Sequence, residues 1–308
     1  MDIDLLTSIL FAMVRTGTPL LLVALGEMVC EKSGVLNLGQ EGMMLMGAVG
    51  GFIGAVTTGS LTLGVLIGMM AGVTMALLFG LVALNLRANQ VATGLALTII
   101  GTGLSAWIGG DYVGRALTGI QPMVIPWLSD IPVIGKALFT QDPLVYVSLG
   151  LTVLVWCFFR FTHAGLTTLA VGENPHSATA VGLPVMPVRY LAVLFGGAMA
   201  GLGGAYLSLA YTPLWTENMT AGRGWIALAL VVFASWRVGR ILLGAWLFGA
   251  ASILHLVLQG MGVSVSSNLL ATLPYVATIV VLVLLSQNQV RKHLMAPMSL
   301  GKPWHPGH

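Results

Sequence analysis

Residues 61–84 read L-T-L-G-V-L-I-G-M-M-A-G-V-T-M-A-L-L-F-G-L-V-A-L, and this stretch carries no charged side chain. A helix needs about 20 mostly apolar residues to cross the hydrocarbon core of a bilayer, so the stretch is long enough to span a membrane. Gly64, Gly68 and Gly72 recur at every fourth position and share one helix face. Small residues spaced in this way let a neighbouring helix approach closely. The stretch therefore predicts a membrane-spanning helix that packs tightly within a bundle.

The composition of the whole chain gives the same indication. Of its 308 residues, 57% are hydrophobic and only 7% are charged, whereas an ordinary soluble domain carries about 25% charged residues. So few charges cannot cover a water-facing surface, and the chain is therefore predicted to fold in a bilayer. Cys30 and Cys157 match no metal-binding or redox spacing, so we interpret them as small hydrophobic residues and expect no metal site.

Further apolar runs predict an all-α polytopic membrane protein. We expect about nine transmembrane helices, within a range of about eight to ten, because the second run contains polar residues and the seventh is short. The runs are residues 5–25, 35–56, 61–84, 90–110, 143–161, 188–210, 222–236, 241–260 and 269–286.

The distribution of Lys and Arg over the connecting segments predicts the orientation, because cytoplasmic loops carry an excess of these residues. If the N-terminus lies outside, most basic residues of the connections fall on the cytoplasmic side, and the opposite orientation reverses that bias. These residues are Lys32, Arg87, Arg160, Arg189, Arg237, Arg240, Arg291, Lys292 and Lys302. The sequence therefore predicts an outside N-terminus and a cytoplasmic C-terminus.

Two regions outside the spans have a distinct character. The outer connection 111–142 is rich in proline, which argues against a full span and favours a short re-entrant or interfacial element. Residues 296–308 are rich in Pro and Gly and are predicted to be a disordered cytoplasmic tail. We therefore expect a single transmembrane domain over residues 1–295.

Residues 170–184, A-V-G-E-N-P-H-S-A-T-A-V-G-L-P, form a polar segment between the fifth and sixth predicted spans. Asn174 is a favoured N-cap, Pro175 fits the first helical position, and Gly182 and Pro184 are stop signals. The segment predicts a short cytoplasmic helix, about 175–181, or about 174–182 with its caps. So short a helix is not stable alone in water. We expect it to dock on a cytoplasmic partner, because it lacks the large apolar residues of a helix that lies on the membrane.

Polar residues also interrupt the second apolar run, where residues 34–42 read G-V-L-N-L-G-Q-E-G. Asn37, Gln40 and Glu41 lie here among three glycines, which favours a broken or irregular helix. Such backbone is tolerated within a membrane only where it lines a cavity or is buried in protein. Two interpretations remain open: the segment is a wall of a translocation pathway, or it is a buried, hydrogen-bonded hinge.

A second polar pair, Asn89 and Gln90, opens the fourth predicted span. Asn is a good N-cap, so a helix-start role is favoured for this pair over contact with a transported solute. We keep both residues as candidates for the pathway.

Motifs for nucleotide, zinc and covalent chemistry are absent from the sequence. The nearest approach to a phosphate-binding loop is G-E-M-V-C-E-K-S at 26–33, where Glu31 occupies the place of a required glycine. No zinc pattern and no recognisable catalytic set occurs. We therefore predict that the chain is not an enzyme and binds no cofactor, and that any ATP chemistry belongs to a partner subunit.

The segment V-G-E-N-P-x-x-A-x-x-x-G-L at 171–183 resembles the coupling-helix loop of bacterial ATP-binding-cassette (ABC) permeases of the ribose/branched-chain amino acid class. The similarity is closest to the smaller permease subunit of nucleoside and simple-sugar importers. Three further stretches agree, at 26–44, 89–105 and 219–233. One departure is S-W-R-V-G-R at 235–240, where relatives more often carry Asn-Pro after the Trp or Arg.

The resemblance implies a subunit of an importer in the bacterial inner membrane. It implies cytoplasmic ATPase subunits, a second and larger homologous permease, an extracytoplasmic solute-binding protein and surrounding lipid as partners, but no nucleic acid. It favours a nucleoside as the solute, then a simple sugar. An autonomous channel or secondary transporter for a small polar solute is the alternative. The residues implied to contact the ATPase are Gly172, Glu173, Asn174, Pro175, His176, Ala178 and Gly182.

Overall fold

The computed structural model describes residues 3–260, 269, 272, 276, 279, 280 and 296–305. This part of the chain is helical and contains no named strand. Its long helices are α1 (Ile3–Lys32), α2 (Gln40–Thr58), α3 (Leu61–Gly80), α4 (Gln90–Gly109), α6 (Pro143–Phe161), α9 (Val185–Tyr206) and α11 (Val238–Gly260). Its short helices are α5 (Ile134–Phe139), α7 (His163–Glu173), α8 (Pro175–Ala180) and α10 (Arg223–Phe233). The segments η1 (Leu81–Asn85), η2 (Gly110–Tyr112) and η3 (Leu207–Tyr211) continue α3, α4 and α9.

The described residues hold 7 helices that are long and apolar enough to cross a membrane, against about nine predicted. The predicted span at 222–236 corresponds to α10, which has only 11 residues. At 1.5 Å per residue this helix reaches about 16 Å, roughly half the hydrocarbon thickness. The predicted span at 269–286 lies almost wholly outside the described residues.

The second predicted span also begins later than expected. The sequence predicts it from residue 35, but α2 starts at Gln40. The chain turns at Gly34, whose φ of +87° suits glycine, and residues 35–39 are not helical. The polar stretch 34–42 is therefore a break between α1 and α2, as its glycines indicated.

Glycine faces hold α2, α3 and α9 together, as the spacing of Gly64, Gly68 and Gly72 predicted. A Cβ placed on Gly72 would meet the backbone oxygen of Gly197, and one on Gly201 would meet the backbone oxygen of Gly68. Close approach of backbones is what small residues permit between membrane helices. We call these contacts the glycine seam.

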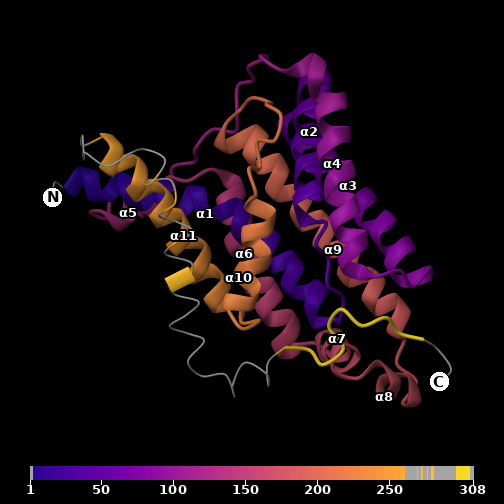
Figure 1. Ribbon diagram of the computed structural model, residues 1–308. Helices are drawn as coiled ribbons and strands as arrows, with labels where there is room; N and C mark the ends of the chain where they lie inside the picture. The colour runs from indigo at the N-terminus through magenta and orange to yellow at the C-terminus, as the bar shows by residue number, and fades with distance from the viewer. Residues whose placement is uncertain are drawn as a thin grey trace.

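The centre of the molecule is α1, whose residues from Leu20 to Leu25 are all fully buried. α11 lies beside α1 (Figure 1), and α9 and α10 also contact it. The N-terminus and α5 lie at one end of the molecule, while α7, α8 and the C-terminal residues lie at the other (Figure 1). The fold thus has two distinct ends. Helix α5 is the short element that the sequence predicts within the connection 111–142.

The C-terminal tail differs from the prediction of disorder over its described part, residues 296–305. The backbone nitrogen of Ser299 donates to Gly172 O at 3.1 Å, and that of Gly301 donates to Gly34 O at 3.2 Å. Ser299 is only 6% exposed. Composition misled here because Pro and Gly also suit an ordered chain of turns when specific partners hold it.

Candidate functional site

Helix α8 is capped as its sequence predicted. Asn174 Oδ1 accepts hydrogen bonds from the backbone nitrogens of His176 and Ser177, at 3.1 and 3.0 Å. Pro175 occupies the first turn, and Gly182 takes a φ of +80°. Leu183 N donates to Ala178 O at 2.9 Å and closes the helix end. The helix ends at Ala180, one residue before the predicted end, because Val181 already leaves helical geometry.

The two faces of α8 have different roles. Pro175 and Ala178 are buried, and Ala178 packs in one cluster with Val171, Val185 and Trp304. The predicted contact residues Gly172, Pro175 and Ala178 therefore face the protein itself. The opposite face is exposed, and we call it the outer face of α8: His176, Ser177, Thr179, Ala180 and Val181. A partner subunit that meets α8 would meet this face.

Helix α7, which the sequence did not predict, leads directly into α8. Thr162 caps its start, and Asn174 is the single residue between the two helices. Glu173 is therefore the last residue of α7 and lies outside α8. Its exposed carboxylate accepts a hydrogen bond from the backbone nitrogen of Met298 at 3.2 Å. α8 is thus continuous in the chain with α7, and the end of α7 contacts the tail.

The end of α7 is joined to the break between α1 and α2 by a small network, which we call the tail clamp. Ser299 Oγ donates to Gly172 O at 2.6 Å and accepts from Arg189 Nη2 at 3.2 Å. Arg189 Nε donates to Ser33 O at 3.2 Å. Gly172 has no space for a side chain, because a Cβ there would meet Lys32 O. The clamp therefore links α7, α9, the tail and the end of α1.

Side chains satisfy the backbone of the break itself. Glu27 Oε1 accepts from Asn37 N at 3.0 Å, and Gln40 Nε2 donates to Glu27 Oε2. Asn37 Oδ1 accepts from Gly39 N at 2.9 Å, and Gln90 Oε1 accepts from Leu36 N at 2.8 Å. Each backbone donor freed by the missing helical turn would otherwise be costly inside a membrane.

Glu41, in the first turn of α2, binds the segment at which α10 begins. Its carboxylate accepts from Thr220 Oγ1 at 2.5 Å, from Gly222 N at 2.8 Å and from Gly224 N at 2.6 Å. The N-terminus of a helix carries partial positive charge and free N–H groups, so it is a favourable place for a carboxylate. Glu41 thus occupies the position that an anionic ligand would otherwise take.

Among the candidates for a pathway, Asn37, Gln40, Glu41 and Gln90 are buried and hydrogen-bonded within the chain. Asn89 accepts from Ala92 N at 3.0 Å and caps α4. For the segment 34–42, these contacts favour the interpretation as a buried, hydrogen-bonded hinge. For Asn89, they favour the role at the start of a helix. A direct contact of these five residues with a solute stays a prediction.

Three residues that these contacts depend on are absent from the predicted site residues: Glu27, Arg189 and Ser299. A signal existed for the first two, since an ionisable group within a membrane span is costly and marks a specific partner. Arg189 was instead counted as a loop cation. Ser299 gave no signal, because its partners lie more than a hundred positions away along the chain.

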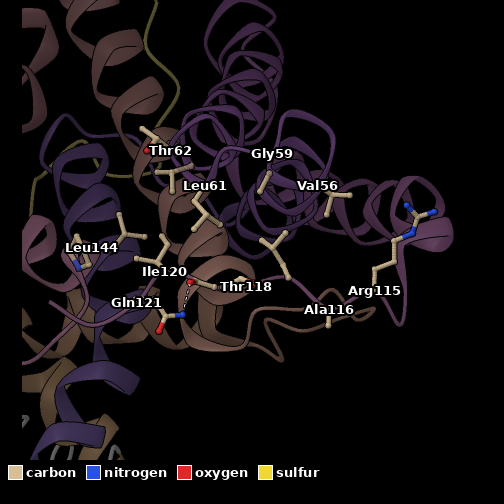
Figure 2. A pocket seen from close by; sticks show the side chains of 15 residues that line it. Val56, Gly59, Leu61, Thr62, Arg115, Ala116, Thr118, Ile120, Gln121 and Leu144 are labelled. Carbon is tan, nitrogen blue, oxygen red and sulfur yellow. Dashed lines mark hydrogen bonds between the residues drawn. The ribbon is translucent and has the colours of Figure 1, made fainter.

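A cavity of about 870 Å³ lies at the other end of the molecule. Figure 2 shows its walls, which come from the turn between α2 and α3, from residues 115–121 and from the start of α6. Gln121 Nε2 donates to Gly119 O at 3.0 Å along this wall. Most of its lining is apolar, and Thr62, Thr118 and Arg115 are among its polar residues.

Asp142 anchors this end to the core. Its Oδ1 caps α6 by accepting from Leu144 N at 3.0 Å, and its Oδ2 accepts from Tyr206 Oη at 3.3 Å. Burial raises the pKa of the Asp142 carboxyl above its ordinary value, against the lowering effect of its hydrogen bonds and of Arg15, whose Nε lies 3.9 Å away. Asp142 therefore holds α1, α6 and α9 together where the cavity begins.

Comparison with known proteins gives consistent matches over most of the chain. The family described as "Branched-chain amino acid transport system / permease component" matches residues 9–285. The putative glucose ABC transporter permease protein TsgC13 of Haloferax volcanii is 42% identical over 89% of this chain and 90% of its own length. The nucleoside ABC transporter permease protein NupC of Lactococcus lactis is 32% identical over 92% and 93%.

A second permease of Lactococcus lactis, the nucleoside ABC transporter permease protein NupB, is 24% identical over 76% of this chain and 68% of its own length. The same alignment covers a smaller share of NupB than of this chain, so NupB is the longer protein. No solved structure matches this chain.

Proposed function

The chain belongs to the family of branched-chain amino acid transport system permease components, and from this premise we propose that it forms half of the translocation pathway of an ABC importer for a nucleoside or a simple sugar. Its role as a multi-span permease subunit follows from its family and relatives. The single observation that carries the coupling role is α8, a capped helix with a buried inner face and an exposed outer face.

The choice of solute rests on the names of the relatives. One relative at 42% identity is named for glucose, and one at 32% is named for nucleosides. Both solutes are polar, neutral and rich in hydroxyl groups. Calorimetry decides between the two solutes. It measures the binding of nucleosides and of simple sugars to the cognate solute-binding protein.

The partner in the membrane is a second, longer permease. Lactococcus lactis has both a relative that matches this chain along its length and a longer one that matches less well. We therefore assign this chain to the smaller half of a heterodimer. ATPase subunits on the cytoplasmic side and a binding protein on the outer side complete the importer.

The orientation places α8 on the cytoplasmic side and the N-terminus outside. The excess of Lys and Arg in the connections supports it. The separation of the N-terminus from α7, α8 and the tail agrees with this arrangement (Figure 1). The cavity of about 870 Å³ then lies at the outer end, where solute arrives.

The mechanism follows from the contacts of α8. ATP binding draws the ATPase subunits together, and the outer face of α8 moves with them. α7 and the tail clamp carry this motion to the break between α1 and α2. Residues 35–39 can change conformation because side chains, and not helical hydrogen bonds, bind their backbone N–H groups. ATP hydrolysis takes place on the ATPase subunits, and this chain transmits their motion through α8, α7 and the tail clamp.

The test of this proposal is Ala180→Arg, which adds a large side chain to the outer face of α8. We expect the variant to reach the membrane normally but to lose co-purification of the ATPase subunit. Ala116→Arg is the matched control, because Ala116 is also exposed but lies beside the outer cavity. Equal retention of the ATPase by both variants would show that α8 is not the coupling surface.

A further inference from the structure

A second cavity, of about 440 Å³, lies near the ends of α1 and α6 and the turn between α10 and α11. Four cationic side chains from these separate elements line it: Lys32, Arg160, Arg237 and Arg240. No acidic residue lines it. The proposed mechanism of transport makes no use of this cavity.

The four cations lack close counter-charges among the residues that the structure describes. None of them forms an ion pair within 4.0 Å or a side-chain hydrogen bond, in contrast to Arg15 with Asp142. Glu173 attracts Lys32 from a greater distance, but Arg237 repels it. Like charges gathered in this way repel one another. An anion in the cavity would relieve this repulsion.

The nearest buried carboxylate cannot serve as that anion. Glu31 is buried, does not line the cavity, and already accepts a hydrogen bond from Nε1 of Trp236, which does line it. Ser235 and Trp236 both take positive φ, +52° and +53°, in the tight turn that ends α10. Arg237 directly follows this turn and Arg240 lies in the first turn of α11, and both line the cavity together with Trp236.

The rest of the lining is apolar and adjoins a face of α6 that is exposed among the residues that the structure describes. Trp156 and Phe159 form one wall, and Trp156 is 50% exposed. On the same helix Val153, Leu154 and Phe161 are also exposed, at 59%, 57% and 68%. Exposed apolar residues on a spanning helix face lipid chains, and Trp is typical of the level of the headgroups. The cavity therefore meets hydrocarbon on one side and carries positive charge on the other.

We propose that this cavity binds the phosphate group of an anionic phospholipid, with the acyl chains lying along α6. Basic pockets between spanning helices are recognised sites for anionic headgroups. A phosphodiester supplies oxygens to the arginines, and the glycerol backbone packs on Trp156 and Trp236. The proposal does not depend on which solute the importer carries.

The test uses the assembled importer, purified with its partner subunits, and measures bound lipid by native mass spectrometry. Phosphatidylglycerol and phosphatidylcholine with the same acyl chains are offered together. The variant is Arg237→Gln/Arg240→Gln, and the control is Arg87→Gln/Lys302→Gln. The control removes two exposed cations from the same end of the protein but outside the cavity. We expect the variant to bind phosphatidylglycerol at least about tenfold more weakly than the control.

Arg160→Gln, on a different helix, is a second variant in case the altered turn does not fold. It should also weaken phosphatidylglycerol binding, with the unfolding temperature unchanged in the absence of lipid. Inorganic phosphate is offered separately, and we expect it not to displace the lipid.

Several results would overturn the proposal. Equal retention of phosphatidylglycerol by the variants and the control would do so, as would equal binding of phosphatidylcholine. Displacement by inorganic phosphate alone would show a site for a soluble anion. Loss of the ATPase subunit from the double variant with lipid still bound would show that the arginines dock a protein.

Discussion

At the scale of single residues, Glu41 shows how a charge is accommodated inside a membrane protein. Both carboxylate oxygens accept hydrogen bonds from the start of α10, and the side chain is only 4% exposed. A carboxylate placed in this way joins α2 to α10. Asn37, four residues earlier in the sequence, belongs to the break between α1 and α2, whereas Glu41 belongs to α2.

We predict that Glu41→Gln lowers the free energy of unfolding by about 1–3 kcal/mol, because the amide group must turn a donor toward one of its three donor partners. Thermal unfolding of the purified importer in nanodiscs measures the effect. Glu217→Gln is the control, since Glu217 is exposed on the segment that precedes α10. Weaker solute binding with an unchanged unfolding temperature would instead identify Glu41 as a pathway ligand.

At the scale of elements, the tail clamp connects the coupling segment to the break between α1 and α2. Ser299 contributes a backbone donor and a hydroxyl group, and both reach Gly172 O. Arg189 is 1% exposed and its two bonds in the clamp go to neutral oxygens. A buried cation held in this way fixes the relative positions of α9 and the clamp.

We predict that Ser299→Ala reduces solute uptake at least about threefold, because two hydrogen bonds worth about 0.5–1.5 kcal/mol each are lost from the tail clamp. ATP hydrolysis by the assembled importer should persist, so less solute should enter per ATP consumed. Met298→Ala is the control, because that neighbouring side chain is 73% exposed. Unchanged coupling in Ser299→Ala would show that the clamp does not transmit motion.

The elements also show what sequence can and cannot predict. Helix α8 was predictable because its signals are local: Asn174, Pro175 and Gly182 set the helix ends from within a few residues. The start of α2 and the short α10 were not, because each depends on a partner elsewhere, such as Glu27 for the break and Glu41 for α10. The order of the tail depends on contacts across most of the chain.

At the scale of the whole molecule, the glycine seam brings several long helices into direct backbone contact. α2, α3 and α9 meet backbone to backbone, and α4 joins them where a Cβ on Gly101 would lie 2.6 Å from Gly42 Cα. Helices in such contact cannot slide without collision. The same close approach joins α10 to α2, since a Cβ on Gly224 would lie 2.6 Å from Glu41 Cα.

We predict that Gly72→Ala destabilises the fold by about 1–3 kcal/mol, because the added methyl group would collide with Gly197 O. Gly103→Ala is the matched control in α4, since nothing lies within 4 Å of a Cβ there. It should be neutral or slightly stabilising, because alanine favours helix over glycine. Thermal unfolding of both variants measures the difference in stability. Equal loss of stability would show that the packing at Gly72 does not depend on glycine.

The tail clamp also has a consequence for the order of biosynthesis. A chain emerges from the ribosome from its N-terminus, and Gly34 and Gly172 are made long before Ser299 and Gly301. Their carbonyl groups therefore lack these hydrogen-bond donors until residues 299 and 301 are synthesised. A chain that terminates early keeps its spans but leaves the coupling segment unfastened. The clamp thus distinguishes a chain that contains Ser299 and Gly301 from one that stops before them.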